Sequence, residues 1–158
     1  MINTKVLFDY DKSFLSKDTK YIAGMDEVGR GPLAGPVVTA CVIMPYDENT
    51  MIDGVFDSKK VSKKNREKLY ALICERAIAY SISVVDVNVI DNIIILNATK
   101  KAMEDSYLKL KKKPDILLID AVKLGVAKIE KSIIKGDATS YAIACASIIA
   151  KVYRDNLM

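Results

Sequence analysis

Hydrophobic and polar residues along the chain follow two different spacings. Short apolar runs bounded by glycine, proline or charged residues indicate strands, and apolar residues three or four positions apart indicate helices. The short runs predict strands at residues 21–25, 37–44, 80–87 and 116–119, with a weaker candidate at 128–135. The longer spacing predicts helices at residues 62–79, at 91–112 and from 138 almost to the last residue. We therefore expect one layered α/β domain over residues 1–158.

Composition restricts the chemistry of this domain. The chain has no histidine, which excludes Ser/His and Cys/His nucleophile pairs and histidine ligands for zinc. Its three cysteines are an odd number, widely spaced and set in apolar runs, so we expect reduced thiols in the core. The net charge of +4 is a mild excess that is compatible with a polyanionic partner. Any catalysis must use carboxylates, lysines, hydroxyls or a metal ion.

No segment predicts a membrane span or a secretion signal. The longest uncharged stretch, residues 31–46, contains three prolines and is too short to cross a bilayer as a helix. The first residues lead into no apolar signal core. We expect a cytoplasmic protein without a membrane partner.

Residues 24–36 combine an acid pair, Asp26 and Glu27, with several glycines and prolines directly after a predicted strand. A dinucleotide-binding fingerprint fits this segment badly, because its glycines lead into a strand and not into a helix. Two interpretations stay open. The segment is a hairpin turn with solvated acids, or its glycines let the backbone approach a ligand while Asp26 and Glu27 bind a cation.

Two further aspartates follow predicted elements. Asp120 comes directly after the buried run 116–119, where it either begins a loop or faces a ligand at the carboxyl edge of the sheet. Asp137 precedes the last helix, either as its N-cap or as a ligand. Four carboxylates in a chain without histidine suit Mg²⁺ or Mn²⁺. Two such ions can activate water and stabilise the leaving oxygen in phosphodiester hydrolysis.

Basic residues complete this hypothesis. Lys59 and Lys60 belong to a lysine-rich run before the helix at 62–79, which is either a solvated face or a nucleic-acid contact. One polar face of the last helix begins near the fourth carboxylate and carries Ser147, Lys151 and Arg154. A strip of donors beside an acidic cluster suits a phosphate backbone.

Five motifs in the same order make the sequence resemble type 2 ribonucleases H, the ribonuclease HII family. The motifs are Gly24-Met25-Asp26-Glu27-Val28-Gly29-Arg30-Gly31-Pro32-Leu33-Ala34-Gly35-Pro36, Asp57-Ser58-Lys59-Lys60-Val61-Ser62, Ala98-Thr99 with Ala102-Met103, Leu118-Ile119-Asp120, and Lys135-Gly136-Asp137 with Ala146-Ser147-Ile148-Ile149-Ala150-Lys151-Val152-Tyr153-Arg154-Asp155. Arginine at the centre of Gly29-Arg30-Gly31 favours type 2 over type 3 enzymes, which usually carry lysine there.

This resemblance implies a ribonuclease H-like α/β fold with a mixed sheet of about five strands flanked by helices. It implies a monomer that cuts the RNA strand of RNA/DNA hybrids, and single ribonucleotides within duplex DNA, leaving 3′-hydroxyl and 5′-phosphate ends. The implied catalytic and metal-binding residues are Asp26, Glu27, Asp120 and Asp137, with Mg²⁺ or Mn²⁺ as the cofactor. The implied substrate contacts are Gly29, Arg30 and Gly31 at the ribose 2′-hydroxyl, and Lys59, Lys60, Ser147 and Lys151 at phosphates.

The sequence also departs from the family pattern. Family members usually continue for several tens of residues past the region of Tyr153, with a tyrosine that stacks under the sugar, and Tyr153 does not match it. The absence of that segment predicts weaker substrate positioning, so a nucleic-acid-binding relative with impaired catalysis is the alternative. A junction resolvase on the same fold is a third interpretation, which the ribose-sensing motif disfavours. Ala121 stands where glycine commonly follows the third carboxylate.

Overall fold

The computed structural model describes residues 3–29, 35–87 and 92–157. Its strands form one mixed sheet in the order β3-β2-β1-β4-β5. They are β1 (Ile22–Val28), β2 (Gly35–Ile43), β3 (Ala79–Val87), β4 (Ile116–Asp120) and β5 (Glu130–Ile133). β2 pairs antiparallel with β1 and β3, whereas β4 pairs parallel with β1 and β5. The predicted fold class, a mixed sheet of about five strands flanked by helices, is confirmed.

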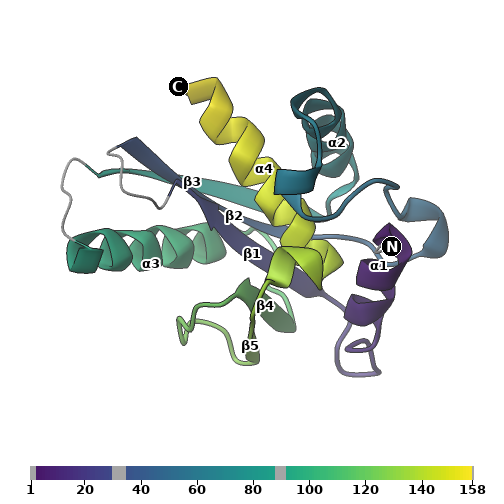
Figure 1. The fold of residues 1–158 in the computed structure, drawn as a ribbon. Coiled ribbons are helices and arrows are strands. Elements are labelled where there is room, and N and C mark those ends of the chain that lie inside the picture. The colour runs from purple at the N-terminus through teal and green to yellow at the C-terminus, as the bar shows by residue number, and fades with distance from the viewer. Residues whose placement is uncertain (1–2, 30–34, 88–91, 158) are drawn as a thin grey trace.

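Helices cover both faces of this sheet (Figure 1). One face packs against α3 (Asn92–Lys109), and the other packs against α4 (Tyr141–Leu157), which α1 (Thr4–Lys12) and α2 (Lys63–Arg76) flank. None of the helices in the described chain combines the length and the hydropathy of a membrane span.

The alternation of side chains along β2 divides the core into two layers. Val38, Ala40 and Val42 pack in the layer of α1, α2 and α4, and Cys41 and Ile43 pack in the layer of α3. The strand is buried on both faces, as its apolar run predicts. All three cysteines are free thiols. Cys41 and Cys145 lie in the core as expected, but Cys74 on α2 is only half-buried, so its predicted core position is wrong.

The observed elements differ from the predicted ones mainly at their ends. Ser62 caps α2 by accepting a hydrogen bond from the backbone N–H of Asn65 (3.2 Å), but the helix ends at Arg76 and not near residue 79. β1 runs three residues beyond the predicted strand, through Val28. The sequence pattern did not predict α1. That helix is short, and its buried residues Leu7 and Phe8 belong to the core cluster that contains Tyr141 of α4.

The amino end of α4 lies directly on β1. A Cβ atom at Gly24 would come within 2.2 Å of the carbonyl carbon of Ala142 and within 2.4 Å of the backbone nitrogen of Ile143. Only glycine permits so close an approach of helix to strand. This contact sets the distance between α4 and the carboxyl end of β1.

A buried carboxyl group from α1 supports the same end of α4. Asp11 has no exposed surface, and its Oδ2 accepts hydrogen bonds from the backbone N–H of Ala142 (2.8 Å) and from the hydroxyl of Tyr46 (2.5 Å). Burial raises the pKa of Asp11 to about 6, although these hydrogen bonds oppose the shift. Asp11 therefore satisfies one of the free N–H groups in the first turn of α4 from a distant segment.

We expect Asp11→Asn to remove a pH dependence from stability. The folded state holds the Asp11 proton more tightly than the unfolded state, so wild-type stability falls as pH rises from about 4 through the folded pKa of about 6. The asparagine variant cannot ionise, so between pH 4.5 and 7.5 its free energy of unfolding should rise by about 2 kcal/mol relative to that of wild type. Urea unfolding at pH 4.5 to 7.5 measures the difference. A difference that stays constant with pH would contradict the raised pKa.

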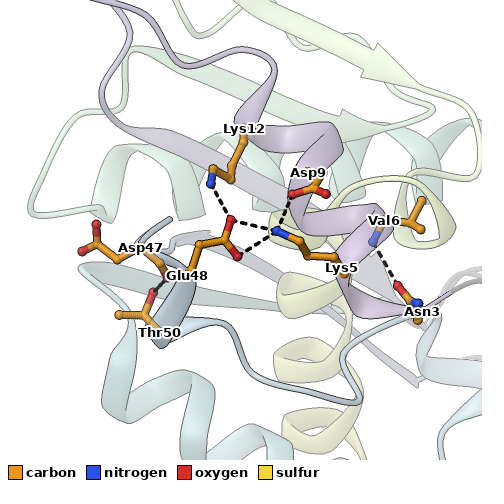
Figure 2. A network of polar contacts seen from close by, with 8 residues as sticks. All are labelled: Asn3, Lys5, Val6, Asp9, Lys12, Asp47, Glu48 and Thr50. Atoms are coloured by element: carbon orange, nitrogen blue, oxygen red, sulfur yellow. Dashed lines mark hydrogen bonds and ion pairs between the residues drawn. The ribbon is translucent and has the colours of Figure 1, made fainter.

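An exposed ion-pair network joins α1 to the 3₁₀ turn η1 (Glu48–Thr50), as Figure 2 shows. The Nζ atoms of Lys5 and Lys12 each lie 2.7 Å from a carboxylate oxygen of Glu48, and Lys5 also contacts Asp9 at 3.0 Å. Hydrogen bonds from Lys12 and Lys5 lower the pKa of Glu48 to about 2. Such exposed pairs contribute little to stability, so the buried Asp11 contacts and the apolar face of α1 hold this helix in place.

Candidate active site

A cavity of about 750 Å³ lies at the carboxyl ends of β1 and β4. Its walls also come from the 3₁₀ turns η2 (Ser58–Lys60) and η3 (Gly136–Ala138) and from α4. All four carboxylates singled out from the sequence line it, namely Asp26, Glu27, Asp120 and Asp137. Residues from five separate segments of the chain therefore meet at one edge of the sheet.

Strand register brings Asp26 and Asp120 side by side. The parallel pairing of β1 and β4 runs to the pair Met25 and Ile119, and the two aspartates follow directly on each strand. Side chains two positions apart on a strand point to the same face of the sheet. Gly24 contacts α4, and Leu118 shares a core cluster with Ile143 of α4. Asp26 and Asp120, two positions later, therefore point to the face that α4 covers. Only 6% of Asp26 is exposed.

Glu27 takes a different direction from its neighbour. It pairs across the sheet with Thr39, whose hydroxyl donates to the carbonyl oxygen of Ala102 on α3, so alternation directs Glu27 away from α4. The backbone N–H of Glu27 donates to Oδ1 of Asp26 at 2.8 Å. The acid pair therefore lies within β1 and not after it, and the interpretation as a turn with solvated acids is wrong for the buried Asp26.

Asp137 reaches the cavity from η3. Oδ1 of Asp120 accepts a hydrogen bond from the backbone N–H of Gly136 (2.7 Å), which ties this turn to the end of β4. Asp137 lies inside the turn and does not cap the last helix. Ser140 does so instead, with its Oγ accepting from the backbone N–H of Ile143 at 3.3 Å. The interpretation of Asp137 as N-cap is therefore wrong.

Burial and repulsion between acids raise the pKa values of two of these carboxyl groups, Asp26 and Asp137. Burial raises the pKa of Asp26 well above its usual value, and the charges of Asp120, Asp137 and Glu27 raise it further. Burial also raises the pKa of Asp137, to about 6, followed by the charges of Asp57 and Asp120. A cation in the cavity would relieve this repulsion.

Basic side chains line the same cavity. Lys59 and Lys60 reach it from η2, and Lys151 reaches it from α4. The ammonium group of Lys151 also pairs with Asp155 at 3.2 Å. Arg154, predicted to share the polar face with Lys151, is not among the described residues that line the cavity. Its Nε donates to the carbonyl oxygen of Pro36 at 2.8 Å, at the start of β2.

Comparison with known proteins decides the family. The family model for Ribonuclease HII matches residues 23–158, which include every carboxylate and lysine of the cavity. The chain belongs to the ribonuclease HII family. Curated Ribonuclease HII proteins of Acetivibrio thermocellus and Enterococcus faecalis are 54% and 52% identical to it over 150 and 154 residues. These alignments cover 94% and 98% of this chain but 58% and 60% of the relatives, so the chain spans less than two thirds of their length.

A solved structure supports the same family. The ribonuclease H2 from Pyrococcus horikoshii OT3 has a TM-score of 0.70 and 26% sequence identity, with 86% of this chain and 72% of that chain covered. The resemblance drawn from five sequence motifs to ribonuclease HII is thus confirmed.

Sequence reasoning missed one acid of the ribonuclease HII cavity. Asp57 lines the cavity, and its interaction with Asp137 raises the pKa of that residue. It also caps η2 by accepting the backbone N–H of Lys59 at 3.0 Å. The family motif contains Asp57, but the sequence analysis assigns a role only to Lys59 and Lys60. An acid two positions before a lysine pair is the signal that could have identified it.

The predicted ribose-sensing segment is described in part. Gly29 lines the cavity with a φ of +109°, and a Cβ atom there would lie 2.4 Å from the carbonyl oxygen of Pro36. This conformation and this contact both require glycine. Arg30 and Gly31 lie outside the described residues.

Ala121, which stands where ribonuclease HII proteins commonly carry glycine, has a left-handed backbone with a φ of +56°. In this backbone region, a Cβ atom destabilises the folded state by about 1–2 kcal/mol. Glycine avoids this strain, but it stabilises the unfolded chain by about 0.4–1 kcal/mol because its backbone has more conformational freedom. We therefore expect Ala121→Gly to raise the thermal midpoint by about 1–4 °C. Calorimetry at neutral pH measures this shift, and Ala121→Val should lower the midpoint instead. A lower midpoint for the glycine variant would contradict the strain.

Proposed function

We propose that this chain is the catalytic unit of a metal-dependent endoribonuclease. It hydrolyses the RNA strand of RNA/DNA hybrids and cuts at single ribonucleotides embedded in duplex DNA, leaving 3′-hydroxyl and 5′-phosphate ends. The observation that carries the proposal is that the four assigned carboxylates lie together with Lys59, Lys60 and Lys151 in the lining of one cavity, in a chain from the ribonuclease HII family. We propose a monomer as the active unit, because a single chain brings the four assigned carboxylates to one cavity.

We assign Asp26, Glu27, Asp120 and Asp137 as ligands of Mg²⁺ or Mn²⁺. Carboxylate oxygens are the donors that these hard cations prefer, and the repulsion that raises the pKa values of Asp26 and Asp137 favours a bound cation. In the part of the chain that the structure describes, no three acidic or thiol side chains are yet arranged so that they could hold a metal ion. When bound, two such ions activate a water molecule and stabilise the leaving oxygen.

The chain's own residues would position the substrate. Lys59, Lys60 and Lys151 line the side of the cavity formed by η2 and α4, where they can contact phosphates on either side of the cut. Gly29, with Arg30 and Gly31, is the segment that we assign to the ribose 2′-hydroxyl, the group that distinguishes RNA from DNA. The three lysines would then hold the duplex so that one ribose lies beside the carboxylates.

A cleavage assay with matched duplexes tests this proposal. The RNA strand of an RNA/DNA hybrid should be cut in Mg²⁺ or Mn²⁺, and the cutting should stop with a chelator. DNA/DNA and RNA/RNA duplexes of the same sequence should stay intact. Binding of the hybrid without cleavage in either metal would overturn the catalytic assignment and favour a binding role. Equal cutting of the DNA/DNA duplex would overturn the ribose specificity.

A further inference from the structure

Two buried hydroxyl groups join η2 to α4 beside the cavity. The Oγ atoms of Ser58 and Ser147 lie 2.8 Å apart, although these residues are 89 positions apart in the chain. Only 5% of Ser58 and 3% of Ser147 is exposed. Both serines line the cavity, but they expose little surface to it and their hydroxyl groups are engaged with each other.

The segment that Ser58 begins is held at further points. Nη1 of Arg66 donates to the carbonyl oxygens of Ser58 (3.2 Å) and Val61 (2.7 Å), which bracket the two lysines. Nη2 of the same guanidinium lies 3.7 Å from Asp155 on α4. Lys59 and Lys60 thus extend from a short backbone segment that is anchored to both α2 and α4.

We propose that the pair of Ser58 and Ser147 is a positioning device for substrate binding. It fixes the backbone of Lys59 and Lys60 so that their ammonium groups meet the phosphates of the duplex. Ser147, which the family resemblance suggested as a phosphate contact, acts through Ser58 and not by direct contact. This inference rests on the proposed function, because it needs a nucleic-acid duplex in the cavity. Lysine side chains are long and flexible, so their reach depends on where their backbone is held.

The salt dependence of binding separates positioning from direct contact. A lysine that neutralises a phosphate releases a counterion, so the slope of log K against log salt falls by about 0.9 for each such contact that is lost. A neutral hydroxyl on a phosphate releases none. Positioning therefore predicts a shallower slope when either serine is truncated, and direct contact predicts an unchanged slope.

The experiment measures binding of a labelled RNA/DNA hybrid to the whole chain by fluorescence anisotropy, in chelator, over a range of KCl concentrations. The proteins compared are wild type, Ser58→Ala, Ser147→Ala and the double variant. Ser106→Ala is the matched control, because Ser106 is a buried serine on α3, across the sheet. Each single variant should reduce the slope by about one to two, and the double variant should resemble the single variants. The control should keep the wild-type slope.

Two further measurements support the comparison. In Mg²⁺, each single variant should raise KM by about 5- to 20-fold and leave kcat within about twofold, because the carboxylates are untouched. In a Lys59→Gln/Lys60→Gln background, Ser147→Ala should leave the slope unchanged, because the contacts it positions are already absent. Thermal unfolding verifies folding. Should an alanine variant not fold, Ser147→Cys, with a weaker donor of similar size, should give a smaller change in slope.

The outcomes are distinguishable. A loss of affinity in Ser147→Ala with an unchanged slope, and no effect of Ser58→Ala, would overturn the proposal in favour of direct contact. Slopes equal to that of the Ser106→Ala control in both variants would overturn it as well. If the wild-type chain neither cut nor bound the hybrid, the proposed function would fail, and the inference that rests on it would fail too.

Discussion

Replacing Asp26 by asparagine is expected to abolish cleavage, lowering kcat by about 10³-fold or more, while hybrid binding survives. Asparagine keeps the size of the side chain and an oxygen that can accept the backbone N–H of Glu27. It removes the charge at the position where β1 and β4 place two carboxylates side by side. Single-turnover cleavage in Mg²⁺ and Mn²⁺ measures the loss, and anisotropy measures the binding.

A stability measurement excludes misfolding as the cause of that loss. Asp26 is buried among other acids, so its neutralisation removes repulsion, and the variant should unfold in chelator at or above the wild-type temperature. Asp105→Asn is the matched control, because Asp105 is an exposed acid on α3, and it should cut at the wild-type rate. Normal cleavage by Asp26→Asn would show that the metal assignment is wrong.

Replacing Gly24 by alanine is expected to destabilise the fold by about 3 kcal/mol or more, or to prevent folding. The added Cβ would collide with backbone atoms of Ala142 and Ile143, which no side-chain rotation can relieve. α4 would have to move away from β1, and with it Ser147 and Lys151 would move relative to Asp26. Urea unfolding measures the loss of stability.

The control for this variant separates collision from backbone strain. Gly125 has a φ of +73° and no atom within 4 Å of the position of its Cβ, so Gly125→Ala adds strain without a collision. It should cost only about 1–2 kcal/mol. Equal losses in the two variants, or wild-type stability of Gly24→Ala, would contradict the close packing of α4 on β1.

Much of the fold follows from local periodicity. Each predicted strand and helix has a counterpart in the structure, because apolar runs and helical spacing reflect burial that local sequence encodes. The last residues of β1 could not be predicted from local sequence, because Asp26 and Glu27 are residue types with a low propensity for strands. Their strand conformation depends on antiparallel pairing of their backbone with β2. Without this pairing, residues of this type would favour a turn.

The acids of the candidate site could be predicted from the sequence, but the contacts that hold the surrounding turns in place could not. Asp120 follows from the general rule that ligands gather at the carboxyl ends of parallel strands. Asp26, Glu27 and Asp137 were also candidates from the residues alone, and the family motifs favoured the metal-ligand interpretation over the structural ones. The role of Asp57 and the contact of Ser58 with Ser147 depend on how a 3₁₀ turn packs against a helix far along the chain. No periodic pattern encodes such a contact. Likewise, helical spacing grouped Arg154 with Lys151, but packing against β2 directs its guanidinium to Pro36.

The most direct measurement is cleavage of a labelled DNA duplex that carries one ribonucleotide, with Mg²⁺, Mn²⁺ or chelator. An all-DNA duplex and the Asp26→Asn variant are the controls. The account predicts metal-dependent cutting at the ribonucleotide that leaves 3′-hydroxyl and 5′-phosphate ends, absent from both controls. A folded wild-type chain that leaves this duplex intact in both metals, or that cuts the all-DNA duplex equally well, would contradict it.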